Sequence, residues 1–326
     1  MSSERSFLLS LCESKSGVEE SLSSPAHIRR LREFAPEPSS AFLLWHGAVY
    51  PLPVTLSVVI ITYKEETNLP RTLESVKPLV ADGKGEIIII DSGSTDRTVE
   101  IARSYGAKVF IEDWKGYAAQ KNSALQKATG DWILSLDADE SIDQELAAQI
   151  ADLILGLGRQ TMRGDVPIYQ TRVLASTIKG FRLNRKNHFL GHWIKHGGFW
   201  PDPKLRLFRR GAAVFEDRLV HEDAMLEGYA GRLKGALVHH SYPTLSDYID
   251  HMNRYSSLGA EMAVATGHRG FSVVNIVLRP LATFVYNYFF RLGFLDGRKG
   301  LLLHLYHAVY VSWKYAKAWE AANKQQ

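Results

Sequence analysis

The chain has 326 residues, of which 45% are hydrophobic and 23% charged, a balance typical of a soluble globular protein with a sizeable core. Its formal net charge of +4 is too small to indicate nucleic-acid binding, although a mild excess of base suits an anionic substrate or a membrane surface. The single cysteine, Cys12, excludes an intrachain disulfide bond and favours a reducing compartment.

Residues 1–53 are rich in Ser, Glu and Pro, and we expect them to form a flexible N-terminal arm. Their apolar patch, FLLSLC, is short for a signal peptide and is followed by acids and serines instead of a cleavage site. No stretch reaches the roughly 18–20 apolar residues of a membrane-spanning helix. We therefore expect a cytoplasmic protein.

From residue 54 onward, buried strands alternate with helices. The runs LSVVIITYK, EIIIIDSGSTD, KVFIED and DWILSLDAD predict strands that are buried on both faces. Helices are predicted between them, over 66–79, 98–105 and 118–128. This alternation predicts an α/β fold with a doubly wound sheet and right-handed crossovers. Because the pattern is irregular from about residue 165 and helical after about residue 245, we expect one domain over 54–245 and a helical extension over 246–326.

Polar clusters follow the first, second and fourth predicted strands, at 62–65, 91–94 and 137–139. Ligands of doubly wound sheets bind beyond the carboxyl ends of the strands, so these clusters should converge on one crevice. The dinucleotide fingerprint G-x-G-x-x-G is absent after the first strand, and so is a G-x-x-x-x-G-K-[ST] phosphate loop. The crevice is therefore expected to bind its ligand in some other way.

Asp137 and Asp139 flank one small residue, so both carboxylates can reach the same space. Paired carboxylates suit a divalent cation that also contacts substrate phosphates. The alternative is an acidic helix N-terminus, since Ser141 and Asp143 follow. Asp91 could accept hydrogen bonds from a base or ribose, or it could simply form a turn.

The motifs VVIITYKEETNL, IIIIDSGSTDRT, GYAAQKNSAL and GDWILSLDADE together resemble those of family-2 glycosyltransferases. These are inverting enzymes of the GT-A fold, a Rossmann-like doubly wound mixed sheet. Further along, GFWPDPKLRLFRRG, FEDRLVHE and RLGFLDGRKGLLLHLYHAVY resemble the branch of lipopolysaccharide inner-core β-1,4-glucosyltransferases. The resemblance implies a UDP-sugar donor, with UDP-glucose expected, a lipid-linked glycan acceptor, and Mg²⁺ or Mn²⁺.

The resemblance also implies roles for individual residues. Asp137 and Asp139 would form the D-x-D metal motif, with Asp139 in direct contact with the metal. Thr62, Tyr63 and Glu65 would line the nucleotide pocket, and Asp91 would contact the uracil or ribose. Lys121 would lie near the base or the diphosphate. Lys64 stands where Asn is common in the family.

An inverting displacement needs a base within hydrogen-bond reach of the acceptor hydroxyl. The candidates lie in FEDRLVHED, and we favour Glu222, with Asp217 second and Glu216 and Asp223 behind them. A charged loop is the alternative interpretation of this segment.

Two further groups of side chains are candidates for binding. Lys204 and Arg206 in KLRLFRR have the spacing of one strand face and could hold the diphosphate or an acceptor phosphate. His188, His192 and His196 are four residues apart, but nearby glycines argue against a helical zinc site, and acceptor contacts or packing are favoured. Trp193 and Trp200 could stack on a sugar.

After residue 245 the chain is aromatic, aliphatic and basic, in runs too short to span a bilayer, which favours a peripheral helix at the cytoplasmic membrane surface. Packing on the catalytic domain or on a second subunit is the alternative, so a homo-oligomer stays open. Three other functions also stay open: a glycosyltransferase acting on a polyprenyl phosphate or another surface polysaccharide, a haloacid-dehalogenase-type phosphatase, and a non-catalytic binding module.

Overall fold

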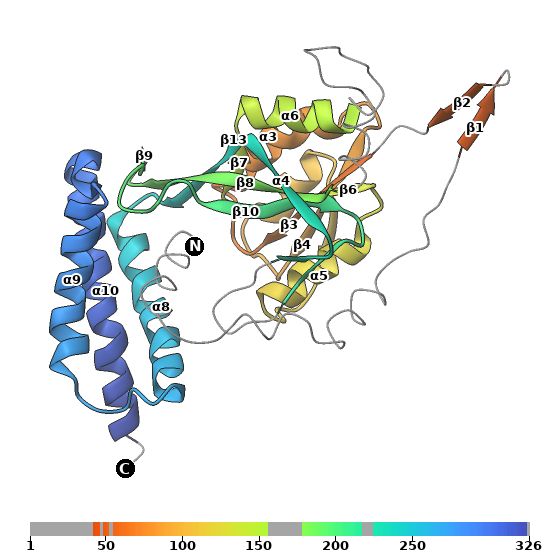
Figure 1. Ribbon diagram of the computed structural model, residues 1–326. Coiled ribbons are helices and arrows are strands. Elements are labelled where there is room, and N and C mark those ends of the chain that lie inside the picture. Colours follow the sequence, from red (N-terminus) through yellow and green to blue (C-terminus); the bar gives the residue numbers. More distant parts are fainter. Residues whose placement is uncertain (1–41, 46–47, 52–54, 156–177, 217–223, 325–326) are drawn as a thin grey trace.

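The computed structural model describes residues 42–45, 48–51, 55–155, 178–216 and 224–324 (Figure 1). The first described segments, β1 (Phe42–Trp45) and β2 (Ala48–Pro51), pair antiparallel with each other. They form a sheet separate from the large one.

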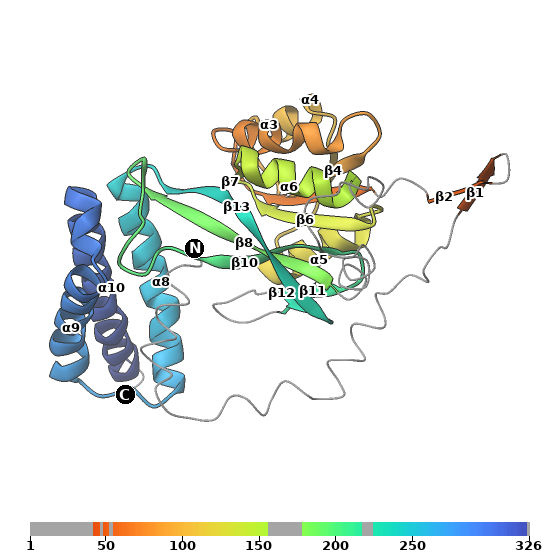
Figure 2. The same cartoon turned by 45° about the horizontal axis from the view of Figure 1, so that its top comes forward.

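The parallel half of the large sheet has the predicted order of elements. It runs β3 (Leu56–Thr62), α3 (Leu69–Val80), β4 (Gly85–Asp91), α4 (Thr98–Ser104), β5 (Lys108–Ile111), α5 (Tyr117–Lys127) and β6 (Trp132–Asp137). The strands pair in the order β5-β4-β3-β6, all parallel. Figure 2 shows α3, α4 and α6 over one face of the sheet and α5 under the other. Burial on both faces explains why these strands are continuous apolar runs.

The second half of the sheet is mixed. It contains β7 (Glu140–Ile142), α6 (Gln144–Leu155), β8 (Ile178–Phe189), β9 (His192–Trp193), β10 (Pro203–Arg209) and β13 (Tyr229–Tyr242). β10 is antiparallel to both β6 and β8, whereas β13 is parallel to β8 and antiparallel to β7. A small hairpin of β11 (Ala213–Phe215) and β12 (Ala224–Leu226) stands beside it. The predicted fold class, a doubly wound mixed sheet with a helical C-terminal extension, is confirmed.

The C-terminal extension is a bundle of α8 (Leu245–Ala265), α9 (Arg279–Val285) and α10 (Gly297–Asn323). Two π-helical segments flank α9, η2 (Val274–Leu278) and η3 (Tyr286–Phe290), and the short 3-10 helix η4 (Gly293–Asp296) leads into α10. Thr244 and Asp247 form a capping box that starts α8.

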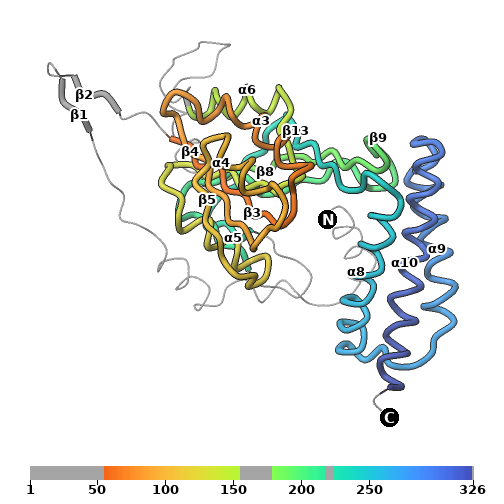
Figure 3. Tube along the Cα trace, turned by 180° about the vertical axis from the view of Figure 1, so that it is seen from behind, coloured from red at the N-terminus to blue at the C-terminus, as the bar shows by residue number. Residues whose placement is uncertain are grey.

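The bundle packs against one end of the long strands, as Figures 1 and 3 both show. Phe189 of β8, Tyr242 of β13 and Tyr248 of α8 share a hydrophobic cluster with residues of α10. The backbone also joins the two parts, since Leu190 N–H donates to Tyr242 O at 2.8 Å and Lys299 Nζ donates to Leu190 O at 2.7 Å. Among the described residues, no helix is both long and apolar enough to cross a membrane. The domain boundaries at 53 and 245 stay a prediction.

Candidate active site

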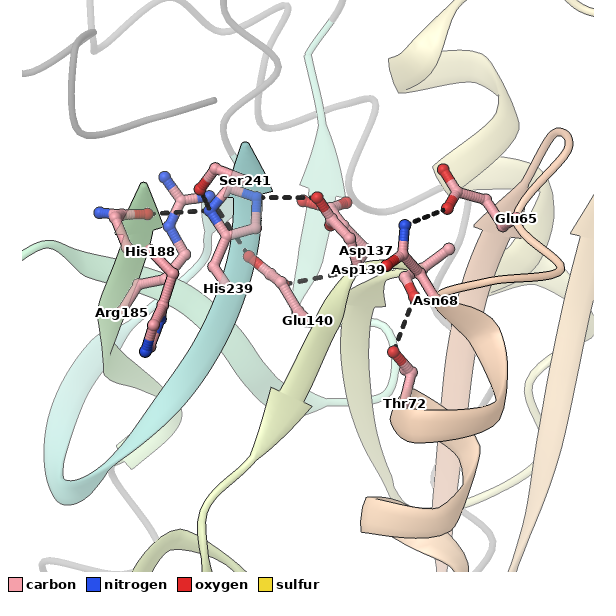
Figure 4. A network of polar contacts seen from close by, with 12 residues as sticks. Glu65, Asn68, Thr72, Asp137, Asp139, Glu140, Arg185, His188, His239 and Ser241 are labelled. Carbon is pink, nitrogen blue, oxygen red and sulfur yellow. Dashed lines mark hydrogen bonds and ion pairs between the residues drawn. The ribbon is translucent and has the colours of Figure 1, made fainter. Parts of the chain in front are cut away.

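The D-x-D motif lies where β6 ends in a turn that leads directly into β7 (Figure 4). The Thr72 hydroxyl of α3 donates to the Ala138 carbonyl at 2.7 Å and so fixes the middle of the turn. Asp137 and Asp139 are each about one quarter exposed, with side-chain accessibilities of 28% and 26%. Both carboxylates therefore open toward solvent at the carboxyl end of the parallel sheet, where the ligand site was predicted.

Asp137 is held by two cations from different parts of the chain. Lys121 Nζ of α5 lies 2.8 Å from Oδ1, and an Arg206 nitrogen of β10 lies 2.5 Å from Oδ2. Burial raises the pKa of Asp137, but the charges of Arg206 and Lys121 outweigh burial and hold that pKa well below its usual range. Asp137 is therefore ionised and has both oxygens engaged.

Behind Asp137 lies a buried ionic cluster that joins β6, β7, β8 and β10. Glu140 Oε1 accepts from Arg206 at 2.9 Å and from Arg185 at 3.3 Å, and both Glu140 and Arg185 are almost completely buried. Asp202 lies 2.9 Å from Arg185 and 3.1 Å from Lys204. With Asp137 and Lys121, the cluster contains three carboxylates and four cations, which leaves one positive charge in excess.

Asp139 faces a histidine that the sequence prediction missed. His239 of β13 is buried, and its Nε2 lies 3.0 Å from Asp139 Oδ2. Burial raises the pKa of Asp139, but the charge and hydrogen bond of His239 outweigh burial and lower the pKa to about 2. Burial lowers the pKa of His239 in turn, more than Asp139 raises it.

Two neighbours of His239 contact its other ring nitrogen. Asn187 Nδ2 donates to Asp202 at 3.2 Å, so its Oδ1 faces His239 Nδ1, 2.8 Å away, and the Ser241 hydroxyl lies 2.7 Å from the same nitrogen. A ring protonated at Nε2 donates to Asp139, whereas a ring protonated at Nδ1 donates to Asn187 and turns the lone pair of Nε2 toward Asp139. In the second arrangement a cation between Asp139 and His239 would bind both. Adjacent ligands of an octahedral ion with bonds of roughly 2.1 Å are also about 3 Å apart, so Asp139 and His239 fit a divalent metal.

The described residues contain no group of three or more His, Cys, Asp or Glu side chains arranged to hold a metal by themselves. Asp139 and His239 would supply two ligands, and Asp137 is already occupied by Lys121 and Arg206. A metal at this place would complete its coordination with water and ligand phosphates, as Mg²⁺ commonly does.

The second polar cluster forms a closed turn after β4. Asp91 is fully buried, and its two oxygens accept from Thr62 Oγ1, from the backbone N–H groups of Gly93 and Ser94, and from Ser94 Oγ. These four bonds use the acceptor capacity of the carboxylate. Thr62 is likewise buried in this turn. The contact predicted between Asp91 and a uracil or ribose would need the turn to open, and it stays a prediction.

The segment after β3 lies close enough to the D-x-D motif for the charges of Asp139 and Asp137 to act on Glu65. Tyr63 is 55% exposed. Lys64 has a φ of 56°, in the left-handed region that Asn tolerates better than Lys, which gives a physical reason for the Asn common at this position in the family it resembles. Burial and the neighbouring charges of Asp139 and Asp137 raise the pKa of Glu65 to about 7, although a hydrogen bond from Asn68 opposes the rise.

Comparison with known proteins identifies the family. The model of glycosyl transferase family 2 matches residues 57–214. The chain is 30% identical over 249 residues to the lipopolysaccharide core biosynthesis glycosyltransferase LpsC of Rhizobium meliloti, covering 74% of this chain and 82% of LpsC. The chain belongs to glycosyltransferase family 2.

Another glycosyltransferase aligns over a similar length. An uncharacterized glycosyltransferase of Rickettsia typhi is 30% identical over 257 residues, covering 76% of this chain and 80% of the relative. Among solved structures, the mannosyltransferase PcManGT from Pyrobaculum calidifontis, in complex with GDP-Man and Mn²⁺, is 15% identical with a TM-score of 0.48 and covers 90% of this chain and 93% of its own. A likeness of that degree says nothing about the donor of this glycosyltransferase.

The catalytic base of the family-2 chain stays a prediction. Asp217, Glu222 and Asp223 lie outside the described residues. Glu216, directly after β11, is described and partly buried.

Lys204 and Arg206 belong to the same ionic cluster but contact different acids in it. Lys204 contacts Asp202 while Arg206 contacts Asp137 and Glu140, and a register shift lies between Leu205 and Leu207. Lys204 and Arg206 are therefore not equivalent positions on one strand face.

The three histidines do not form a helical ladder. His188 is on β8 and stacks on His240 with ring centroids 5.2 Å apart, His192 is on β9, and His196 lies 3.1 Å from Asp296. The ring of Trp193 packs edge-to-face on Trp200.

Proposed function

We propose that this family-2 glycosyltransferase is an inverting enzyme that moves glucose from UDP-glucose to a hydroxyl of a lipopolysaccharide core or a related lipid-linked glycan. The observation that carries the proposal is the convergence of Asp137, Asp139, Lys121 and Arg206 at the carboxyl end of β6. Acids that bind a metal and cations that bind phosphate are what departure of a nucleoside diphosphate requires.

Asp139 and His239 are the proposed metal ligands. When bound there, Mn²⁺ or Mg²⁺ would act as a Lewis acid on the diphosphate oxygens, where negative charge develops as the sugar leaves. An imidazole ligand favours Mn²⁺ over Mg²⁺, which prefers oxygen. In this role His239 would carry its proton on Nδ1 and donate it to Asn187 Oδ1, 2.8 Å away.

Arg206 and Lys121 are the proposed phosphate-binding groups. Both are buried and paired with Asp137, so their positions are set before the donor arrives. The single excess positive charge of the ionic cluster would offset part of the negative charge of a diphosphate. Because the site is preorganised, little reorganisation is needed as charge develops on the leaving group.

The sugar must be attacked from the side opposite the diphosphate, with a base to accept the proton of the acceptor hydroxyl. We propose Glu222 for this role, with Asp217 as the second candidate. Tyr63 and Glu65, which follow β3, are proposed to contact the nucleotide, together with Thr62 and Asp91 if their turn opens.

The proposed acceptor rests on the relatives. LpsC is described as a lipopolysaccharide core biosynthesis enzyme, and it aligns with most of this chain. The reaction is proposed to occur in the cytoplasm, at the inner face of the plasma membrane.

A thermal-shift screen with UDP, GDP and several sugar nucleotides, each with and without Mn²⁺, tests the proposal. A ligand that binds only the native state raises the melting temperature by mass action. We expect a Mn²⁺-dependent rise with UDP and UDP-glucose, which Asp139→Ala abolishes and the exposed-acid control Asp250→Asn on α8 retains. No rise with any nucleotide, or an undiminished rise and full activity in Asp139→Ala, would contradict the proposed site.

A further inference from the structure

The segment from η2 to η4 has an unusual distribution of apolar residues. Six of its large apolar side chains are exposed, and we call them the outer face: Val277, Leu278, Leu281, Phe289, Phe290 and Leu295. All six are more than half exposed, from 52% for Val277 to 75% for Phe290. Figures 1 and 3 show α9 on the side of the bundle farthest from the sheet.

The fully buried positions of α9 and η3 are small or polar residues, whereas Ile276 and Tyr288 are only partly buried against the bundle. Pro280, Thr283 and Asn287 recur at helical spacing and are buried. The Thr283 hydroxyl donates a hydrogen bond to the Arg279 carbonyl oxygen, one turn earlier in the helix, at 2.8 Å. A helix in water normally buries its large apolar residues and exposes its polar ones. The reversed arrangement indicates that the surroundings of the outer face are apolar.

The exposed charges near the ends of this segment are positive. Between Glu261 and Glu320 the chain has seven Lys and Arg residues but a single acid, Asp296, which is buried. Arg269 and Arg298 are exposed and bracket the segment at its two ends. Two copies of this face packed on each other would bring their cations together without exposed acids from the same segment to pair with them. The outer face is therefore complementary to a partner that has an apolar interior and a negatively charged surface.

We propose that the outer face docks on the surface of an anionic lipid bilayer. Phe and Leu side chains would enter the boundary between headgroups and acyl chains, while Arg269 and Arg298 meet the lipid phosphates. The segment would lie along the membrane, consistent with the finding that none of the described helices is long and apolar enough to span it. The inference deepens the proposed function, because a lipid-linked acceptor would reach the enzyme from the same surface.

Vesicle co-sedimentation of the full chain tests the proposal, with vesicles of phosphatidylcholine alone or mixed with phosphatidylglycerol. We expect the protein to bind the anionic vesicles more tightly than the neutral ones, and added salt to weaken the binding. Phe290→Asp and Leu281→Asp should each weaken binding to anionic vesicles by about tenfold or more, since each loses the burial of a large apolar side chain.

Tyr229→Asp is the matched control, because Tyr229 is as exposed as Phe290, at 75%, but lies on β13. It should bind vesicles like the wild type. Equal binding to both vesicle types, unchanged binding of the two outer-face variants, or no binding by the wild type would overturn the proposal. So would a wild-type dimer in light scattering that Phe290→Asp converts to a monomer. Vesicle binding needs neither donor nor acceptor, so its failure is distinguishable from failure of the proposed glucosyl transfer.

Discussion

Replacing Glu140 with Gln removes one negative charge from the most deeply buried part of the candidate site. Glu140 Oε1 accepts from Arg206 and Arg185, and Oε2 accepts from the Asp137 N–H at 3.2 Å. A Gln that keeps its oxygen toward the arginines must turn its NH₂ group toward that N–H, where two donors meet. The change therefore weakens two charge-assisted bonds and leaves a donor without an acceptor.

The size of the effect follows from this burial. Removing one partner of a buried ion pair destabilises a protein by roughly 3–5 kcal/mol, because the remaining charges lose their compensation. For a chain of this size, each kcal/mol shifts the melting temperature by about 2 °C. We expect Glu140→Gln to melt roughly 6–10 °C below the wild type.

Thermal unfolding followed by circular dichroism measures this difference. Glu100→Gln is the matched control, since Glu100 pairs with Arg97 at 3.2 Å on the surface, and exposed pairs contribute little. We expect the control to melt with the wild type. If Glu140→Gln also melted within about 2 °C of the wild type, the cluster would contribute less than a buried pair should, and its assignment as the support of Asp137 would be wrong.

Three further predictions follow from the site. His239→Gln should weaken Mn²⁺ binding, measured by electron paramagnetic resonance in the presence of UDP, by about tenfold or more, and an unchanged affinity would remove His239 from the metal site. Glu222→Gln should lower turnover by about a hundredfold or more with donor binding intact, whereas near-normal turnover would move the base to Asp217 or elsewhere. Because the folded state raises the pKa of Glu65 from 4.5 to about 7, its ionisation opposes folding, and stability should fall as pH rises between these values. In urea titrations, Glu65→Gln should therefore be more stable than the wild type above pH 7, by less than about 3 kcal/mol, and equally stable well below pH 4.5. Equal stability of the two proteins at every pH would contradict the raised pKa of Glu65.

The sequence by itself determined the parallel half of the sheet and the place of the D-x-D motif. Strands such as Leu56–Thr62 and Trp132–Asp137 are continuous apolar runs between turns and helices, and their order leaves few topologies. Because parallel strands end at the same edge, Asp91 and Asp137 could be placed near each other without coordinates.

Only the tertiary structure decided what those side chains contact. The sequence around His239 and Glu140 gave no sign of their roles, because their partners are distant in the sequence. His239, on β13, pairs with Asp139, and Glu140 pairs with arginines 45 and 66 residues away. Asp91 and Asp137 are both acids at strand ends, yet the first is enclosed by its own turn and the second is held by Lys121 and Arg206. A local pattern specifies which residues leave a strand, whereas the partners of a buried charge come from strands that pair over long sequence separations.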